Sequence, residues 1–294
     1  MGDSAPTAYF KGRQIMKDIG LVFGGGGGKG AYQIGVWKAI REFGIDKNIT
    51  AVSGTSVGAL NAALYVNGDY ETAEKIWFDL SEDKILTPKE TIFEMLGEAA
   101  ETILKDIDEP VRLVSDIVKK AGEGIWSRHG LEEIIDDHVS LKAISGSELK
   151  IFAGCTLIPE MKIKYFKLNG LMPSEIKKIL IASSAIPVVF PNQKIGDDIY
   201  IDGGVSGSKG NIPIKPLYDE GYRNIIVVCL NEGDRIDRSL YDGAYITELY
   251  PQRGLGSFIS GTLDFSSDGA RKRLSQGYED ACIMFEKTAD FLKG

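Results

Sequence analysis

Two glycine-rich strand exits near the start of the chain constrain its fold more than any other feature. The first is the glycine run 24–30, interrupted only by Lys29, which follows the apolar stretch 19–22. The second is the pentapeptide GTSVG at 54–58, which follows the apolar stretch 49–52. Each runs into a segment with helical spacing, so both predict strand-to-helix turns. In a parallel α/β sheet such turns open at one edge, which places backbone donors and a serine in the same crevice.

The remaining pattern predicts a three-layer α/β domain. Short apolar β-branched runs alternate with segments of helical period, and Pro159 marks the turn of a hairpin. The further elements expected are helices at 31–43, 57–67, 173–183 and 268–293, a hairpin of strands 149–157 and 161–168, and strands at 199–201 and 225–230.

Between residues 85 and 125 there are no apolar β-branched runs of the kind that predict strands. Apolar residues recur there at helical spacing on one side, with acidic residues on the opposite side. This pattern predicts a helical insertion, either a cap packed on the domain or a mobile lid over an apolar substrate. No long Pro, Ser or charged tract divides the chain. We therefore expect a flexible leader at 1–18 and one catalytic domain at 19–294 that contains the insertion.

Charge and composition exclude several classes of function. The formal net charge is −8 and the pI is about 5.0, which disfavours nucleic-acid binding and leaves room only for local or transient contact with a membrane surface. Three widely spaced cysteines predict buried, reduced thiols with neither a disulfide nor a zinc site. The absence of a signal-peptide core and of a long apolar run favours a cytoplasmic location.

The GTSVG segment fits the G-x-S-x-G turn, in which the flanking glycines Gly54 and Gly58 let the chain bend sharply and expose the serine. Ser56 is therefore a candidate nucleophile, and its alternative role is that of a helix cap. A Ser-Asp-His order needs a histidine late in the chain, and a His-Asp-Ser order needs one before Ser56. The only histidines are His129 and His138, in a charged helical stretch that we expect to face solvent.

The remaining candidate base is Asp202, which ends an apolar run and is followed at once by Gly203 and Gly204. Its alternative role is that of a turn aspartate bonded to its own backbone. An aspartate near its reference pKa of roughly 3.9 accepts a hydroxyl proton poorly, so a Ser56–Asp202 dyad requires burial or a short, well-aligned hydrogen bond.

The glycine run is suited to stabilising a tetrahedral oxyanion, because residues without Cβ can point several amides in one direction. A P-loop would need glycine at position 23 and Ser or Thr at position 30, and neither is present. A dinucleotide fingerprint is met formally by Gly25, Gly27 and Gly30, but the second strand ends in the serine turn instead of an acidic residue. We therefore expect no nucleotide cofactor.

Three ordered motifs, GGGGGKGAY at 24–32, GTSVG at 54–58 and DGG at 202–204, resemble those of the patatin-like phospholipases. The segment ASSAIP at 182–187 and Gly277-Tyr278 extend the similarity along the chain. This resemblance implies a three-layer sandwich with a mixed, mainly parallel sheet, and a lipid acyl hydrolase that needs neither metal nor cofactor.

By the same resemblance, Ser56 is the nucleophile and Asp202 the base. The amides of Gly25, Gly26 and Gly27 form the oxyanion hole, while Gly54, Gly58 and Gly203 support the turns. Lys29 stands where the family has Arg or Lys, and either steadies the loop or contacts a phosphate. The substrate is expected to be a lipid or other acyl ester. The alternative is a catalytically silent lipid-binding or scaffold protein of the same fold.

Overall fold

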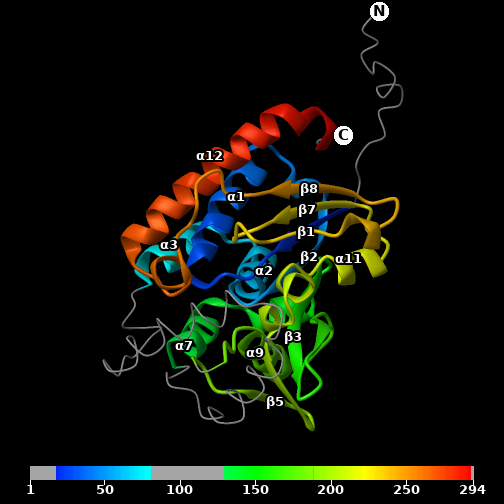
Figure 1. The fold of residues 1–294 in the computed structure, drawn as a ribbon, viewed down its shortest axis with the longest axis vertical. Helices are drawn as coiled ribbons and strands as arrows, with labels where there is room; N and C mark the ends of the chain where they lie inside the picture. The colour runs from blue at the N-terminus through cyan, green and yellow to red at the C-terminus, as the bar shows by residue number, and fades with distance from the viewer. Residues whose placement is uncertain (1–17, 81–128, 188, 293–294) are drawn as a thin grey trace, which may run out of the picture.

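The computed structural model describes residues 18–80, 129–187 and 189–292. They form one eight-stranded sheet with helices on both faces (Figure 1). The strands are β1 (Ile19–Phe23), β2 (Ile49–Thr55), β3 (Lys150–Ile158), β4 (Lys162–Lys167), β5 (Gln193–Ile195), β6 (Asp198–Asp202), β7 (Asn224–Val228) and β8 (Tyr245–Leu249).

The sheet is parallel in its centre and antiparallel at one end. Neighbouring strands follow the order β5-β6-β3-β2-β1-β7-β8, and β4 also pairs with β3. The pairs β1–β2, β1–β7, β2–β3 and β7–β8 are parallel. The strands β4, β5 and β6 form the antiparallel part through β3–β4, β3–β6 and β5–β6. The expected mixed, mainly parallel sheet is confirmed.

Helices of very different length connect the strands. The α-helices are α1 (Ala31–Glu42), α2 (Val57–Asn67), α3 (Tyr70–Asp79), α7 (His129–His138), α8 (Leu141–Ser145), α9 (Pro173–Ser183), α10 (Ser208–Asn211), α11 (Lys215–Asp219) and α12 (Ser267–Leu292). The tighter or wider turns are the 3₁₀ segments η1 (Gly27–Gly30), η2 (Asp46–Asn48), η3 (Gly203–Ser206) and η4 (Arg238–Leu240), and the π segment η5 (Phe258–Thr262).

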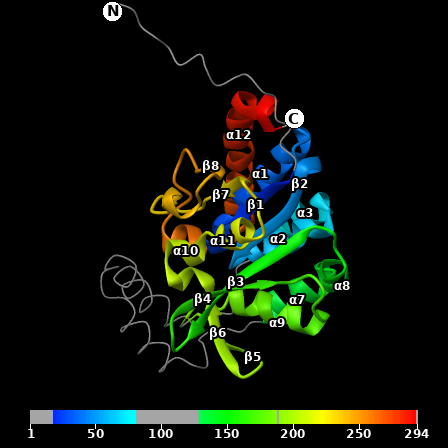
Figure 2. The same cartoon turned by 90° about the vertical axis from the view of Figure 1, so that its right-hand side faces the viewer.

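The alternation of side chains along β1 divides the core into two layers. Leu21 and Phe23 belong to a large apolar cluster with α1, α2, α9 and α12, whereas Val22 belongs to a second cluster with Leu217 of α11 and Val227 of β7. Successive residues of a strand point to opposite faces, so one short strand serves both cores. Figure 2 shows α1 and α12 on one side of β1 and β7, with α10 and α11 on the other.

Two glycines allow the first and last helices to pack closely. A Cβ at Gly35 in α1 would lie 2.0 Å from the carbonyl oxygen of Leu274 in α12, and one at Gly277 would lie 2.0 Å from that of Tyr32. Only glycine fits at both positions. The long helix α12 therefore lies directly on α1 (Figures 1 and 2), and the carboxyl-terminal part of the chain covers the helix that follows the glycine run.

Most elements expected from the sequence are present, with ends shifted by a few residues. The elements α3, α8, α10, α11, β5 and β8 are absent from those expected, and all of them except the ten-residue α3 span five residues or fewer. The insertion expected at 85–125 and the leader expected at 1–18, apart from its last residue, lie outside the described residues.

Candidate active site

Ser56 occupies a sharp turn between β2 and α2. Its backbone has φ 57° and ψ −131°, a conformation that non-glycine residues rarely adopt. A Cβ at Gly54 would lie 2.2 Å from the carbonyl oxygen of Gly58, and a Cβ at Gly58 would lie 2.2 Å from that of Phe23. The two glycines are therefore required for the chain to fold back on itself around the serine.

The hydroxyl of Ser56 makes no capping hydrogen bond to α2, although the residue stands at the helix N-cap. Its backbone N–H instead donates to the hydroxyl of Ser183 over 2.9 Å, and that hydroxyl donates to the carbonyl of Gly154 over 2.7 Å. Ser183 thus ties the turn to β3. The resemblance includes Ser183 in the segment ASSAIP at 182–187, but the sequence assigns it no role at the serine turn.

Asp202 reaches Ser56 because β2 and β6 meet end to end. The strand β2 pairs with residues 150–154 of β3 in parallel, and β6 pairs with residues 155–158 in antiparallel orientation. Residues 152–157 pair with β4, which must occupy the opposite edge of β3. The carboxyl ends of β2 and β6 therefore point toward each other along the same edge. Asp202 lies at the end of a strand antiparallel to β3, whereas Ser56 follows a strand parallel to β3.

The two carboxylate oxygens of Asp202 differ in their surroundings. Oδ1 accepts a hydrogen bond from the Gly204 amide over 2.7 Å, as expected for a turn aspartate. Oδ2 is buried and has no partner of regular hydrogen-bond geometry among the described residues. The backbone N–H of Asp202 donates to the carbonyl of Ala185 over 2.9 Å. One oxygen therefore holds the turn, and the other is available to a neighbour.

Burial raises the pKa of Asp202 to about 6, while the Ser56 hydroxyl and the Gly204 amide act in the opposite direction. The Ser56 hydroxyl thus interacts with this carboxyl group, although their contact falls outside regular hydrogen-bond geometry. A carboxylate deprived of water is a stronger base than one in solution. Desolvation therefore supplies the rise in the pKa of Asp202 that a Ser56–Asp202 dyad would require.

The glycine run follows β1 directly, and only some of its backbone amides donate hydrogen bonds within the described residues. The Gly24 amide donates to the carbonyl of Val228, and the Gly25 amide donates to that of Asn211 over 3.1 Å. The amides of Gly26 and Gly27 donate no hydrogen bond within the described residues. Gly27 has φ +56° and lines the same cavity as Ser56. Of the three glycines expected to bind an oxyanion, Gly26 and Gly27 therefore keep amide donors that are free of partners in the described part of the chain.

A buried polar cluster supports one side of the glycine run. The ammonium of Lys29 donates to Asn231 Oδ1 over 3.0 Å, and the amide of Asn231 donates to the Gly25 carbonyl over 3.2 Å. Asp234 accepts hydrogen bonds from the side chains of Asn211 and Asn231. Burial lowers the pKa of Lys29, and the carboxylate of Asp234 opposes this effect. Lys29 therefore points into the protein and steadies the loop.

A second chain of hydrogen bonds supports the other side of the run. Gln33 donates to the Gly24 carbonyl over 2.7 Å. Asn61 donates to Gln33 over 2.8 Å and to the Gly30 carbonyl over 3.0 Å. The indole of Trp77 completes the chain by donating to Asn61 over 3.0 Å. All three side chains are buried, so satisfying these groups fixes the relative positions of the glycine run, α2 and α3.

An apolar cavity of about 70 Å³ opens beside Ser56. It is lined by Gly27, Ser56, Val57, Leu60, Asn61, Leu64, Ile76, Trp77, Leu80, Leu131, Ile134, Ser184, Ile186, Phe190 and Phe265. The hydroxyl of Ser184 is buried and has no partner within the described residues. Ile76, Leu80 and Ile134 also line a neighbouring cavity of about 190 Å³. The surroundings of Ser56 suit a hydrocarbon chain better than a charged group.

The remaining residues of chemical interest are histidines and cysteines, and one of them, Cys155, pairs with Asp202 across β3 and β6. His138 is exposed on α7 and lines the neighbouring cavity with Asp137. Cys155 and Cys229 are buried and Cys282 is partly buried, all as free thiols. None of the described helices is both long and apolar enough to cross a lipid bilayer.

The chain is similar to proteins named lysophospholipases in sequence and to a solved protein structure in fold. The sequence model of the family described as patatin-like phospholipase matches residues 21–218. A lysophospholipase NTE1 of Cryptococcus neoformans var. neoformans is 28% identical over 218 residues, which is 74% of this chain and 11% of that protein. A lysophospholipase nte1 of Aspergillus terreus is 53% identical over 49 residues, which is 17% of this chain and 3% of that protein.

The chain thus corresponds to a small part of these relatives. Among solved structures, VipD from Legionella pneumophila superposes with a TM-score of 0.55 at 16% identity, over 92% of this chain and 67% of VipD. At this low identity the superposition establishes a common fold.

Proposed function

Because the chain belongs to the patatin-like phospholipase family, we propose that it hydrolyses lipid acyl esters, as a phospholipase A or lysophospholipase, with Ser56 as nucleophile and Asp202 as base. The observation that carries this proposal is the buried Asp202 carboxyl, with its Oδ2 unpartnered within the described residues, close to the Ser56 hydroxyl on a strained turn. A structural aspartate would use both oxygens or lie in water.

In the proposed first step, Ser56 Oγ attacks the acyl carbonyl carbon and transfers its proton to Asp202. The tetrahedral intermediate then collapses, the C–O bond to the alcohol breaks, and Asp202 returns the proton to the leaving oxygen. Water attacks the acyl-enzyme in the second step, losing a proton to Asp202. The fatty acid leaves as Ser56 regains its proton. Each proton taken by the carboxylate is returned within the same half-reaction.

We propose the amides of Gly26 and Gly27 as the donors that stabilise the oxyanion. Both are free within the described residues, and Gly27 lines the cavity beside Ser56. The Gly25 amide would first have to release the Asn211 carbonyl. Preorganised donors of this kind lower the barrier because they need no reorientation as charge develops.

The proposed substrate follows from the lining of the cavity and the direction of Lys29. Apolar side chains surround the entrance to Ser56, which favours an acyl chain at this position. The Lys29 ammonium is held by Asn231 inside the protein. Recognition of a phosphate by Lys29 is therefore not part of the proposal.

The test compares Ser56→Ala, Asp202→Asn and the control Asp198→Asn in the hydrolysis of p-nitrophenyl butyrate. Asp198 lies in the same strand as Asp202 but is exposed. We expect losses on the order of 10³-fold or more in the first two variants and near-normal activity in the third. Full activity in folded Ser56→Ala or Asp202→Asn would refute the dyad.

Labelling with a fluorophosphonate separates the enzyme from a silent lipid-binding protein. The hydrolase reacts at Ser56, and Ser56→Ala abolishes the label. A native protein that binds lipid vesicles but takes no label would support the silent alternative.

A further inference from the structure

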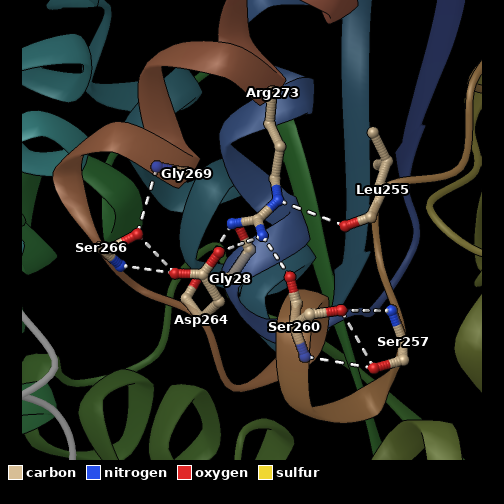
Figure 3. A network of polar contacts seen from close by, with 8 residues as sticks. All are labelled: Gly28, Leu255, Ser257, Ser260, Asp264, Ser266, Gly269 and Arg273. Carbon is tan, nitrogen blue, oxygen red and sulfur yellow. Dashed lines mark hydrogen bonds and ion pairs between the residues drawn. The ribbon is translucent and has the colours of Figure 1, made fainter.

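Arg273 of α12 is a buried cation whose guanidinium gathers acceptors from the glycine run and from the loop 255–264 (Figure 3). It donates to the carbonyls of Gly28 (3.3 Å), Leu255 (3.4 Å), Ser260 (2.8 Å) and Asp264 (2.8 Å), and to Asp264 Oδ2 (2.5 Å). Four of these five acceptors are backbone oxygens. Arg273 therefore fixes the path of the main chain in these segments.

The loop held by Arg273 is also in direct contact with the glycine run. A Cβ at Gly27 would lie 2.1 Å from the carbonyl oxygen of Thr262, and a Cβ at Gly28 would lie 2.0 Å from that of Asp264. The chain at 261–264 is thus a wall against which the glycine run packs without side chains between them. Any shift of this wall moves Gly27 and Gly28 with it.

From these contacts we infer that Arg273 is a positioning residue for the oxyanion-binding amides. The inference rests on the proposed function. Gly28, whose carbonyl is held, is one residue from Gly27 and two from Gly26, within a single tight turn. Arg273 lies outside the match to the family sequence model, which ends at residue 218. The carboxyl-terminal helix thereby contributes to the geometry of a site built near the other end of the chain.

The planar guanidinium is essential to this role. Its donors point in several fixed directions, whereas an ammonium concentrates three donors at one point. A lysine at position 273 can retain charge and the partnership with Asp264, but it cannot hold the wall and the glycine run together. Arg273→Lys therefore separates geometry from charge.

The experiment measures kcat and KM for p-nitrophenyl butyrate in Arg273→Lys, Arg273→Ala and the control Lys272→Ala, whose side chain is exposed one residue away. We expect kcat to fall about 10- to 100-fold in both Arg273 variants while KM changes by no more than about threefold, since the oxyanion exists only after attack. The loss is expected to be smaller for lysine than for alanine. Lys272→Ala is expected to match the unmodified protein.

A short-chain alkyl trifluoromethyl ketone, which forms a tetrahedral adduct with a serine, provides a readout that a general loss of stability would not move. Its inhibition constant is expected to rise by the same factor as kcat/KM falls. Circular dichroism checks folding, and Asp264→Asn serves as the second variant if Arg273→Ala does not fold. An unchanged kcat in folded Arg273→Lys, or an effect confined to KM, would overturn the inference alone. An unmodified protein without esterase activity would overturn the proposed function and the inference together.

Discussion

Thr55 and Asp202 pair with consecutive residues of β3, Gly154 and Cys155, from opposite directions along the same edge. Ser56 follows Thr55 directly, so the end-to-end meeting of β2 and β6 brings the hydroxyl to the carboxylate. Two strands far apart in the sequence are aligned by a third. This arrangement gives the proposed dyad rigid structural support, because strands hold side chains more precisely than loops do.

The first prediction concerns the pH dependence of catalysis. The base must be ionised to accept the Ser56 proton, and burial raises the pKa of Asp202 to about 6. We therefore expect kcat/KM to rise about tenfold per pH unit below this value and to level off above it. A pH profile with an ester whose leaving group does not titrate in this range measures the midpoint. A midpoint near pH 4 would mean that a water-exposed carboxyl controls the rate.

The second prediction concerns the stability cost of the buried carboxylate. Its pKa is higher in the folded protein than in the unfolded chain, so ionisation opposes folding. The cost is absent below about pH 4 and complete above about pH 6, with an upper value of about 3 kcal/mol for a shift of this size. Asp202→Asn keeps an oxygen for the Gly204 amide and removes the charge.

We accordingly expect Asp202→Asn to be inactive but more stable than the unmodified protein at pH 7.5, with the advantage disappearing near pH 4. Urea unfolding at both pH values provides the measurement. An equal difference in the free energy of unfolding at the two values would contradict the assigned cause.

The third prediction concerns Ser183, which joins Ser56 N–H to the Gly154 carbonyl. Ser183→Ala leaves a buried amide unpaired, with an expected cost of about 1–3 kcal/mol, and frees the strained turn. We expect kcat to fall about tenfold or more because the Ser56 hydroxyl is no longer held in the orientation needed for attack. Ser145→Ala is the matched control, since Ser145 also bonds a backbone carbonyl, that of Leu171, away from the site. If both variants lose the same activity, Ser183 has no special role.

The fourth prediction concerns acyl-chain length. Ile134 lines both the cavity at Ser56 and its larger neighbour, and its side chain is only partly buried. Ile134→Ala should connect the two spaces and raise the ratio of kcat/KM for p-nitrophenyl octanoate over butyrate about three- to tenfold, since each methylene in an apolar pocket contributes modestly. Ile236→Ala, in the apolar cluster on the other face of the sheet, should leave the ratio unchanged. An unchanged ratio in Ile134→Ala would show that acyl chains do not pass this residue.

The sequence by itself determined the local chemistry of the chain. Gly54 and Gly58 identify the serine turn because steric limits at a tight bend act between near neighbours. The apolar runs before Ser56 and Asp202 predict strand ends for a similarly local reason, and the scarcity of histidine directs attention to a carboxylate. The α/β fold class and most long elements follow from the same short-range periodicity.

Only the tertiary structure decided which of these groups meet and how they are held. The antiparallel direction of β6 and its placement on the same edge of β3 as β2 depend on long-range strand pairing, which leaves no local signal. The burial that raises the pKa of Asp202 depends on the surrounding layers. The contacts of Ser183 and Arg273 with the turn and the glycine run join residues more than a hundred positions apart, and such contacts arise when packed helices and strands bring distant backbone groups into hydrogen-bond range.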